Sequence, residues 1–432
     1  MSTETQTPIR IGLVGIGKIA RDQHAPTLAA DPDFVLTATA SPHGRLLDIP
    51  AYPTLEAMLD AHPEMDAVAL CTPPQVRHGL AHSALSRGKH VFLEKPPGAT
   101  LSEVEDLAAT AARVNKTLFA SWHSRFAPAV EPARAWLCGR RIVSARIVWR
   151  ENVRVWHPGQ DWIWRPGGLG VFDPGINALS IATALLPKPF FLTEATLDFP
   201  ENRQAPIAAQ LRFSGSDLIP ITAEFDWRET GPQIWDIEVE TDDGRLRLSE
   251  GGAVATVHGE GGTKGEVLVV GVADEYAGLY RQFAGLIAQG TSDVDVSPLR
   301  HVADAFLLGA RRLTDAFIEA YGPDPLAGGQ ARGDLVPPAW EAQRRLHLAA
   351  ANLGQMDRFQ LGGPLGFLPG QMHNADRRIG CIGLDQGRAV ARHLPRAEIV
   401  AAVRQKLKIC AIQIDRQGQR QLIGGEDPRT AL

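Results

Sequence analysis

The 432-residue sequence is poor in cysteine, and this limits the kind of protein it can encode. Its four cysteines, Cys71, Cys138, Cys381 and Cys410, are widely scattered and form no C-x-x-C pair. Such spacing builds neither a disulfide framework nor a zinc knuckle, so a reducing cytoplasm is the expected location. The start of the chain is short and polar, and no apolar run approaches transmembrane length, so we expect no membrane partner.

The sequence also lacks an excess of positive charge. Its formal net charge is -5 and no basic stripe stands out, which argues against nucleic acid or an anionic membrane as a partner. Hydrophobic residues make up 44% of the chain, which is enough to fill the cores of two or more domains. The composition therefore predicts an ordinary soluble protein with room for two domains or more.

A glycine-rich turn follows the first apolar strand. The strand Ile9–Val14 leads directly into GIGKIA at residues 15–20, a G-x-G-x-x-A pattern that precedes a helical stretch. Gly15 would make the tight turn, Gly17 would let a pyrophosphate approach the backbone, and Ala20 would let the helix pack on the strand. The diphosphate would then lie over helix N–H groups. This context indicates nucleotide binding, and the alternative is a glycine turn without a ligand.

Apolar strands alternate with helical stretches up to about residue 121. We expect strands over 34–40, 67–72, 90–93 and 117–121, with one helix ending near residue 87 and another over 101–114. This rhythm predicts an α/β fold with a doubly wound parallel sheet, whose ligands bind at the carboxyl ends of the strands. Lys95 and His123 follow two of those ends. His78 and His82 are spaced four apart on a helix, but without a third ligand nearby we expect no metal site.

The second strand lacks the acidic residue that an NAD site commonly carries at its end. The segment after it contains Ser41, His43 and Arg45, and the last two lie within reach of a 2′-phosphate. We therefore expect NADP to be accepted alongside NAD; the alternative is that Arg45 is simply solvated. The predicted cofactor contacts are Gly15, Gly17, Lys18, Ile19, Ser41, His43, Arg45, Thr72, Pro73, Glu94 and Lys95.

The stretch GGLGVFDPGINALS, residues 167–180, places an acid and an amide four residues apart. Asp173 before Pro174 at the head of an apolar run predicts a helix start, with the helix reaching about Leu185. Asn177 lies one turn later and projects in the same direction as Asp173. The pattern leaves two interpretations: a pair aimed at a substrate, or a capping Asp173 beside a buried structural Asn177.

Alternating segments after Arg125 predict a second domain rich in strands. The expected helices near its end span Glu275–Gln289 and Pro298–Ala320. Eight of the nine tryptophans fall between Trp122 and Trp235, and indole faces pack well against the C–H face of a pyranose. The expected strands are Ile142–Val148, Pro206–Phe213, Ile219–Trp227, Trp235–Glu240, Arg245–Leu248 and Glu266–Val270.

Four linked motifs, GIGKIARDQH, LEKPPGATL, WHPGQDWIW and GGLGVFDPGINALS, resemble the glucose–fructose oxidoreductase and inositol dehydrogenase family. Within it they are most similar to the branch of bacterial L-arabinose and D-galactose 1-dehydrogenases. The resemblance implies a Rossmann domain (1–123) and an α+β domain (124–321) with a large, open, mostly antiparallel sheet, through which a homodimer forms. It also implies that the last helix packs back on the first domain, and that the activity is NAD(P)-dependent oxidation of an aldopyranose to its aldonolactone.

The resemblance also assigns roles to residues. Asp173 would be the base for the hydroxyl proton, Asn177 would orient the sugar, and Lys95 would hold the reacting oxygen and keep Asp173 ionised. Lys95 as the base, with Asp173 as its partner, is the alternative. The implied substrate contacts are His123, Glu151, Trp156, His157, Asp173, Asn177 and Trp235. Three other functions stay open. The first is a sugar-sensing regulator without catalysis, the second is a polyol or inositol dehydrogenase, in which His is usual at position 177, and the third is a reductase that works in the opposite direction.

Residues 322–432 do not share the resemblance. They are rich in Arg and Gln and contain 15 basic and 10 acidic residues. Residues 362–366 predict a loop, and residues 340–352 and 389–405 predict helices without a common core. We expect a poorly ordered extension without a function of its own; a small accessory module and an out-of-frame extension of the coding sequence are the alternatives.

Overall fold

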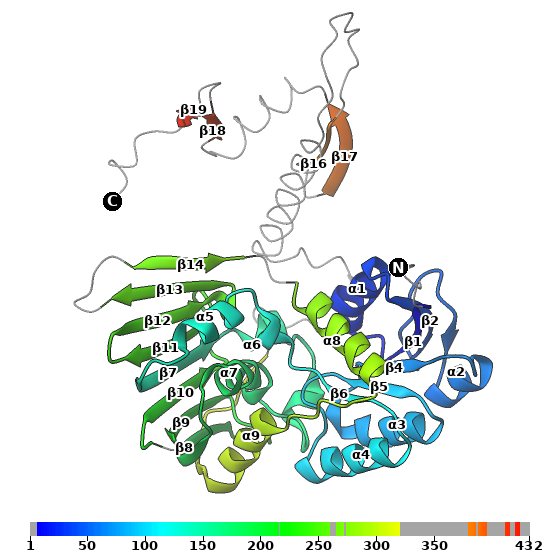
Figure 1. Cartoon of the computed structure of the whole chain (residues 1–432), viewed down its shortest axis with the longest axis horizontal. Coiled ribbons are helices and arrows are strands. Elements are labelled where there is room, and N and C mark those ends of the chain that lie inside the picture. The colour runs from blue at the N-terminus through cyan, green and yellow to red at the C-terminus, as the bar shows by residue number, and fades with distance from the viewer. Residues whose placement is uncertain are drawn as a thin grey trace, which may run out of the picture. The chain divides into compact units, whose positions relative to one another are not determined.

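The computed structural model describes residues 7–215, 217–259, 265–271 and 274–319, together with four short strands between residues 379 and 423. Close contacts divide the chain into two units, residues 1–348 and 349–432. Every predicted site residue belongs to the first unit, which contains two large sheets (Figure 1).

The first sheet has six strands in the order β3-β2-β1-β4-β5-β6, and every neighbouring pair is parallel. This is the doubly wound order of a dinucleotide-binding fold, so the predicted fold class is confirmed. The sequence did not suggest the short β3 or the helix α2 (Leu55–Ala61) that follows it. The strands are β1 (Ile9–Val14), β2 (Phe34–Ala40), β3 (Ala51–Tyr52), β4 (Ala67–Leu70), β5 (His90–Leu93) and β6 (Leu118–Ala120).

Buried side chains alternate between the two faces of this sheet, as a period of two requires. Val68, Leu70 and Leu93 pack beneath α2, α3 (Pro74–Ser86) and α4 (Leu101–Arg113). The opposite face is covered by α1 (Ala25–Ala30) and by α8 (Glu275–Gln289), which comes from much later in the chain (Figure 1). The members of that second cluster include Ile11, Leu13, Phe92, Tyr276, Leu279, Tyr280 and Phe283.

The second sheet has nine strands in the order β14-β13-β12-β11-β7-β10-β9-β8-β15. Only the β7/β10 and β8/β15 pairs are parallel, so the expectation of a mostly antiparallel sheet is confirmed. The helices α5 (Val130–Leu137), α7 (Phe172–Leu185) and α9 (Ser297–Leu308) pack on one face (Figure 1). The strands are β7 (Ile142–Arg150), β8 (Phe190–Pro200), β9 (Ala208–Gly215), β10 (Pro220–Asp226), β11 (Ile234–Thr241), β12 (Gly244–Ser249), β13 (Val254–Gly259), β14 (Glu266–Val270) and β15 (Ala310–Thr314).

The helix predicted over 298–320 is wrong in its second half. The helix α9 ends at Leu308, and Gly309 takes an extended conformation that starts β15, which pairs with β8. The strands β8 and β13 were also not expected. The last helix was expected to pack on the first domain; α9 does contact α4, but α8 is the helix that covers the first sheet.

In the second unit, β16 (Ile379–Asp385) pairs with β17 (Arg388–Leu394), and β18 (Ala411–Ile414) pairs with β19 (Arg420–Ile423). The helix expected over 389–405 is therefore wrong where β17 lies, since those residues form an antiparallel hairpin. The other expectations for 322–432, including the loop at 362–366 and the helix at 340–352, lie outside the described residues.

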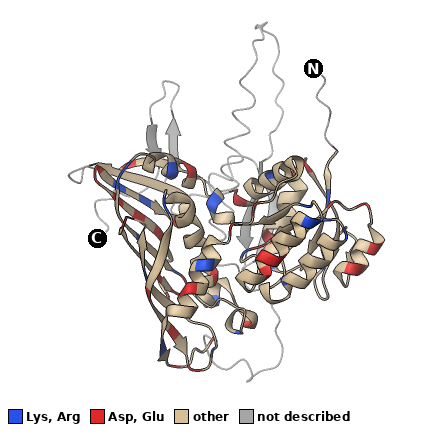
Figure 2. Cartoon of the chain, turned by 60° about the horizontal axis from the view of Figure 1, so that its bottom comes forward, with Lys and Arg blue, Asp and Glu red and all other residues tan. Residues whose placement is uncertain are grey.

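Acidic and basic positions are interleaved along the long strands and helices (Figure 2). None of the helices in the described part is long and apolar enough to cross a membrane. Among the same residues, no group of three or more His, Cys, Asp and Glu side chains is arranged to hold a metal ion. His78 instead pairs with Asp106, at 2.8 Å between Nε2 and Oδ2.

Candidate active site

The two sheets meet at an ion pair between Lys95 and Asp173. Lys95 follows the carboxyl end of β5, and Asp173 is the second residue of α7. The Lys95 ammonium donates to the Asp173 carboxylate (Nζ to Oδ2, 3.2 Å) and to its backbone carbonyl (3.0 Å). The side chains are 16% and 4% exposed, respectively. Two residues that are 78 positions apart in the sequence are thus brought together at the carboxyl end of β5, where the sequence predicted a ligand site.

Asp173 does not cap the helix. The helix α7 begins at Phe172, its N-cap residue is Val171, and no side chain accepts a capping hydrogen bond there. The interpretation of Asp173 as a capping residue is therefore wrong, because its carboxylate turns to Lys95 instead. Within residues 172–182, Asn177 is the one residue that is not buried. Asn177 is half-buried and lies one turn beyond Asp173.

His157 approaches the same carboxylate oxygen. It follows the short helix α6 (Val153–Trp156), and its Nε2 lies 3.3 Å from Asp173 Oδ2. Burial lowers the pKa of His157 below its usual value, so the ring is neutral near pH 7. Burial alone would raise the pKa of Asp173, but Lys95 and His157 together outweigh it, so the pKa lies below its usual value. Asp173 is therefore an ionised, buried carboxylate.

Glu151 lies directly after β7 and is held by two indoles. Trp227 Nε1 donates to its Oε1 at 3.3 Å, and Trp235 Nε1 donates to its Oε2 at 2.9 Å. Burial raises the pKa of Glu151 to about 8, and the nearby Asp173 carboxylate adds to the shift. Glu151 thus keeps its proton at neutral pH. The sequence did not single out Trp227, whose only signal was its place among the clustered tryptophans.

Aromatic rings build one wall of this region. The Trp156 ring lies 5.1 Å from that of Trp235, which in turn stacks on Trp149 at 5.6 Å. The His157 ring lies 5.3 Å from Trp227. These residues come from α6, β7, β11 and the end of β10, so the wall forms only when the nine-stranded sheet is complete.

His123 contacts residues of α8. It follows β6, its Nδ1 pairs with Glu275 of α8, and its ring stacks on Tyr276 at 5.7 Å. The structure thus brings together Lys95, Glu151, His157 and Asp173. It directs the contacts of His123 to α8.

The glycine-rich turn has the space that its pattern predicts. Gly15 has a φ of 88°, and a Cβ there would lie 2.8 Å from a Thr72 methyl carbon. A Cβ on Gly17 would meet no protein atom within 4 Å, so the backbone there faces open space suited to a diphosphate. The Thr72 hydroxyl is buried without a hydrogen-bond partner in the described structure. Of the next residues, Lys18 pairs with Asp22 and Ile19 is 36% exposed.

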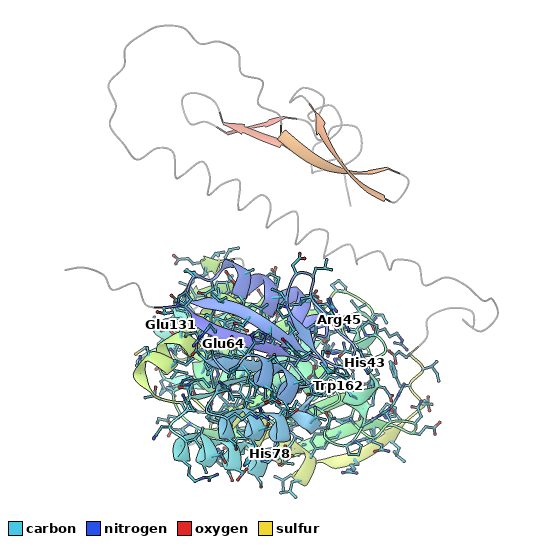
Figure 3. All side chains as sticks on the ribbon, turned by 90° about the vertical axis from the view of Figure 1, so that its right-hand side faces the viewer. His43, Arg45, Glu64, His78, Glu131 and Trp162 are labelled. Atoms are coloured by element: carbon cyan, nitrogen blue, oxygen red, sulfur yellow. The ribbon has the colours of Figure 1, made fainter. Side chains whose placement is uncertain are left out.

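The loop after β2 carries the residues expected to contact a ribose. Ser41 Oγ accepts a hydrogen bond from the backbone of Gly44 at 3.1 Å. His43 and Arg45 are exposed on this loop (Figure 3). Pro73, at the end of the next loop, is also exposed. These positions are open to a nucleotide.

Glu94 lies under the site in a buried network. Its Oε1 contacts His24 Nε2 (3.0 Å) and the Tyr276 hydroxyl (2.6 Å), and its Oε2 accepts from the Lys95 backbone (2.7 Å). Burial opposes its charge, but the contacts with His24 and Tyr276 hold the pKa of Glu94 well below its usual value. The Glu94 side chain therefore connects Lys95 to α8. A direct contact between Glu94 and the cofactor stays a prediction.

Arg77 is a site residue that the sequence did not reveal. It lies on the buried face of α3 and donates to the backbone carbonyls of Thr72, Glu94 and Pro96. It thus ties together the loops that follow β4 and β5. An arginine on an otherwise small and apolar helix face was the available signal.

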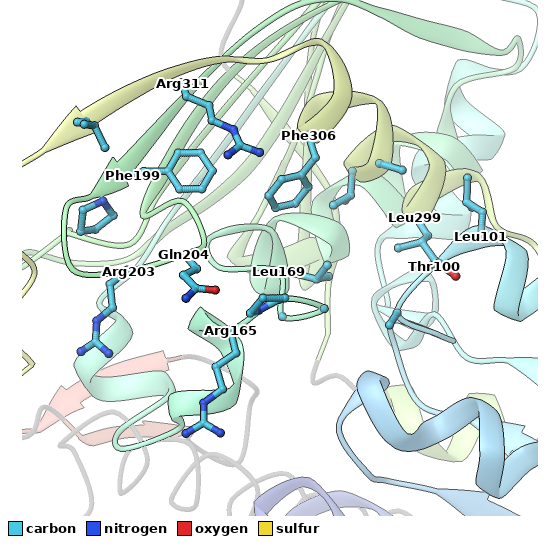
Figure 4. A pocket seen from close by; sticks show the side chains of 18 of the residues that line it. Thr100, Leu101, Arg165, Leu169, Phe199, Arg203, Gln204, Leu299, Phe306 and Arg311 are labelled. Atoms are coloured by element: carbon cyan, nitrogen blue, oxygen red, sulfur yellow. The ribbon is translucent and has the colours of Figure 1, made fainter.

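A cavity of about 590 Å³ lies beside the site, between α9, the loop 165–169 and the turn after β8 (Figure 4). Phe199, Phe306, Arg203 and Arg311 are among its lining residues. No residue predicted for catalysis or substrate binding lines it. The loop 165–169 continues directly into α7, and Ala99 and Leu101, which also line the cavity, follow closely after Lys95 in the chain.

Comparisons with known proteins identify the chain's relatives. Residues 9–121 match the GFO/IDH/MocA model of an oxidoreductase family with an NAD-binding Rossmann fold. A galactose 1-dehydrogenase of Pseudomonas fluorescens is 46% identical over 312 residues, which is 72% of this chain and 99% of that protein. The chain belongs to the GFO/IDH/MocA oxidoreductase family.

Solved structures share the fold of this chain. The crystal structure of D-galactose 1-dehydrogenase from Rhizobium etli is 56% identical, with a TM-score of 0.69 over 73% of this chain and 100% of that one. A 3-ketoreductase from Actinomadura kijaniata, solved with NADP, shares the fold at 21% identity and a TM-score of 0.64, over 71% of this chain and 100% of that one. The chain is thus an oxidoreductase with a nicotinamide nucleotide site, and neither the sensor nor the polyol dehydrogenase is favoured.

Proposed function

We propose that this oxidoreductase converts an aldopyranose to its aldonolactone by oxidation at the anomeric carbon. The observation that carries the proposal is the buried Lys95–Asp173 pair, with His157 on the same carboxylate oxygen and Asn177 one turn along α7. The two relatives reported above at 46% and 56% identity are named galactose 1-dehydrogenases, so D-galactose is the first candidate substrate. L-Arabinose, D-fucose and D-xylose differ from it in few groups and are the next candidates.

The reaction removes a proton from the anomeric hydroxyl group and a hydride from the anomeric carbon. The bound nicotinamide supplies the acceptor for the hydride. Asp173 accepts the proton, because its carboxylate is ionised and buried where water does not compete. Lys95 donates to that carboxylate and holds the reacting oxygen beside it. The alternative, in which neutral Lys95 is the base, makes Asp173 its positioning partner and is tested below.

We propose that NADP is used alongside NAD. The open space over Gly17 would take the diphosphate, and Ser41, His43 and Arg45 present no acidic group that would repel a 2′-phosphate. The remaining predicted contacts, Lys18, Ile19, Thr72, Pro73 and Glu94, surround the same edge of the first sheet.

Arg45→Ala tests the nucleotide preference. Loss of a charge-assisted hydrogen bond to the 2′-phosphate should raise KM for NADP about 10-fold. KM for NAD, which has no such phosphate, should change less than 2-fold. Initial rates with each nucleotide at saturating sugar measure this, with the exposed Arg113→Ala on α4 as the control. An equal rise in both KM values would contradict the assignment.

We propose that Glu151 binds the sugar as a neutral acid, flanked by Trp156, His157 and Trp235. Because its pKa is raised to about 8, Glu151 carries its proton below that pH and loses it above. A protonated carboxyl donates to a sugar oxygen, whereas its anion repels the Asp173 carboxylate nearby. Sugar binding should therefore weaken as pH rises through about 8.

Glu151→Gln tests this role, since the amide keeps a donor but cannot ionise. The wild-type kcat/KM for the sugar should fall above pH 8, and the variant should lack that fall. Profiles between pH 6 and 10 measure it, with nucleotide affinity as the control. A variant that keeps the same alkaline fall would show that another group titrates.

The proposed activity is tested directly by following NAD(P)H absorbance with a panel of aldopyranoses and both nucleotides. Formation of NAD(P)H with D-galactose or L-arabinose supports the proposal, and lactone is the expected product. Nucleotide binding without turnover of any aldose would contradict it and return the sensor to consideration.

We also propose a homodimer through the uncovered face of the nine-stranded sheet, in the reducing cytoplasm suggested by the free Cys71 and Cys138. Residues pointing away from the helices on this face form cross-strand ion pairs, including Arg212–Glu194 at 3.4 Å and Arg247–Asp236 at 2.6 Å. Interleaved charges of both signs are self-complementary across a two-fold axis.

A further inference from the structure

The segment Asp315–Glu319, here called the strap, follows β15, and Asn202 forms two hydrogen bonds with it. Asn202 accepts a hydrogen bond from the Phe317 backbone N–H (2.9 Å) and donates to the Phe317 carbonyl (3.0 Å). The Phe317 side chain is 7% exposed, whereas the adjacent Ile318 is 61% exposed. The Phe317 ring therefore points into the protein, whereas the Ile318 side chain points outward.

The strap lies against the loop that carries Trp156 and His157, here called the substrate loop (residues 153–165). Arg154 of this loop donates to the carbonyls of Glu319 (3.0 Å) and Ile318 (2.5 Å), and its guanidinium lies 4.5 Å from the Phe317 ring centre. The Gly159 backbone N–H donates to the Glu319 carboxylate. The outer side of the substrate loop is thus held by the strap.

A row of aromatic rings connects the strap to the catalytic carboxylate. Phe317 lies 5.4 Å from Trp164, Trp164 lies 5.2 Å from Trp227, and Trp227 lies 5.3 Å from His157. His157 then reaches Asp173, and Trp227 also donates to Glu151. Because Phe317, Trp164 and Trp227 are buried, none can move far without opening a void.

We infer that Phe317 is a positioning residue for sugar binding, acting through Trp164 and Trp227 on His157 and Glu151. This inference rests on the proposed function, because those two residues are sugar contacts only in that function. Phe317 itself contacts no group proposed to touch sugar or cofactor. None of these rings belongs to the residues predicted to bind the nucleotide at the first sheet. The strap should therefore affect the binding of the sugar and not that of the nucleotide.

Phe317→Ala should therefore raise KM for the sugar about 10-fold, because small displacements of positioning groups have large effects on bound geometry. The KM for the nucleotide should stay within 2-fold of the wild type. Hydrogen exchange of the substrate loop should become faster, with no change in peptides of the first sheet. The matched control is Ile318→Ala, which removes an exposed side chain from the same segment and should alter none of these quantities.

Asn202→Ala is a second variant, and it creates no cavity in the hydrophobic core. It removes the two strap hydrogen bonds from an exposed position and should reproduce the changes at a smaller size. Unchanged sugar KM and unchanged loop exchange in both variants would overturn the inference, as would an equal loss of sugar and nucleotide affinity. The hydrogen-exchange measurement needs no turnover, so it tests the effect of the strap on the substrate loop even if the protein oxidises no aldose. Absence of aldose oxidation would refute the proposed function and not this effect of the strap.

Discussion

Asp173→Asn is expected to lower kcat for aldose oxidation about 1,000-fold, within the range that a positioned base contributes. The amide keeps the shape of the side chain but cannot accept the hydroxyl proton. The NAD(P) dissociation constant should stay within 2-fold of the wild type, because Asp173 lies on α7 and not at the glycine-rich turn. Single-turnover rates and nucleotide titration measure the two quantities.

The matched control is Asp106→Asn, since Asp106 also pairs with a histidine but lies exposed on α4. It should leave kcat unchanged. A loss of less than 10-fold in Asp173→Asn would show that Asp173 is not the base and would favour Lys95.

Lys95→Met is expected to lower kcat/KM at pH 6 by at least 100-fold, and part of the loss should be regained at pH 9. In the wild type, Lys95 and His157 together outweigh burial and keep the pKa of Asp173 low. Without the ammonium, burial should raise the pKa of Asp173, so a smaller fraction of the carboxylate is ionised at pH 6 than at pH 9. The pH profile of kcat/KM measures this.

The same profile separates the two candidate bases. If Lys95 were the base, Lys95→Met would be inactive at every pH, with no alkaline recovery. Lys89→Met is the control, because Lys89 also donates to backbone carbonyls and precedes the opposite end of β5. It should keep the wild-type profile.

Local pattern was sufficient to predict every strand of the first sheet except the two-residue β3, but several strands of the second sheet were missed. The strands β1, β2, β4 and β5 are short apolar runs followed by segments with helical periodicity. This alternation is typical of a parallel sheet covered by helices. The strand β15 was missed because ARRLT follows α9 without a turn residue other than Gly309, so the apolar period appears continuous. What makes it a strand is its pairing with β8, a distant contact that no local window contains.

The candidate site shows the same division. Lys95 and Asp173 could be named because each follows a recognisable structural signal. His157 and Glu151 could be named only through the family resemblance, since a histidine in a loop and an acid after a strand carry no signal of their own. The contact between Trp227 and Glu151 depends on the register of β10 beside β7, which sets the two residues next to each other.

The packing of α8 on the first sheet has a consequence for how the protein is made. Tyr276, Tyr280 and Phe283 cover a face of that sheet together with α1, although they are translated well over a hundred codons after β6. On the ribosome, the nucleotide-binding half therefore emerges with an apolar face uncovered until α8 has left the exit tunnel. A fragment ending at residue 123 should therefore aggregate when expressed alone, because this apolar face stays exposed.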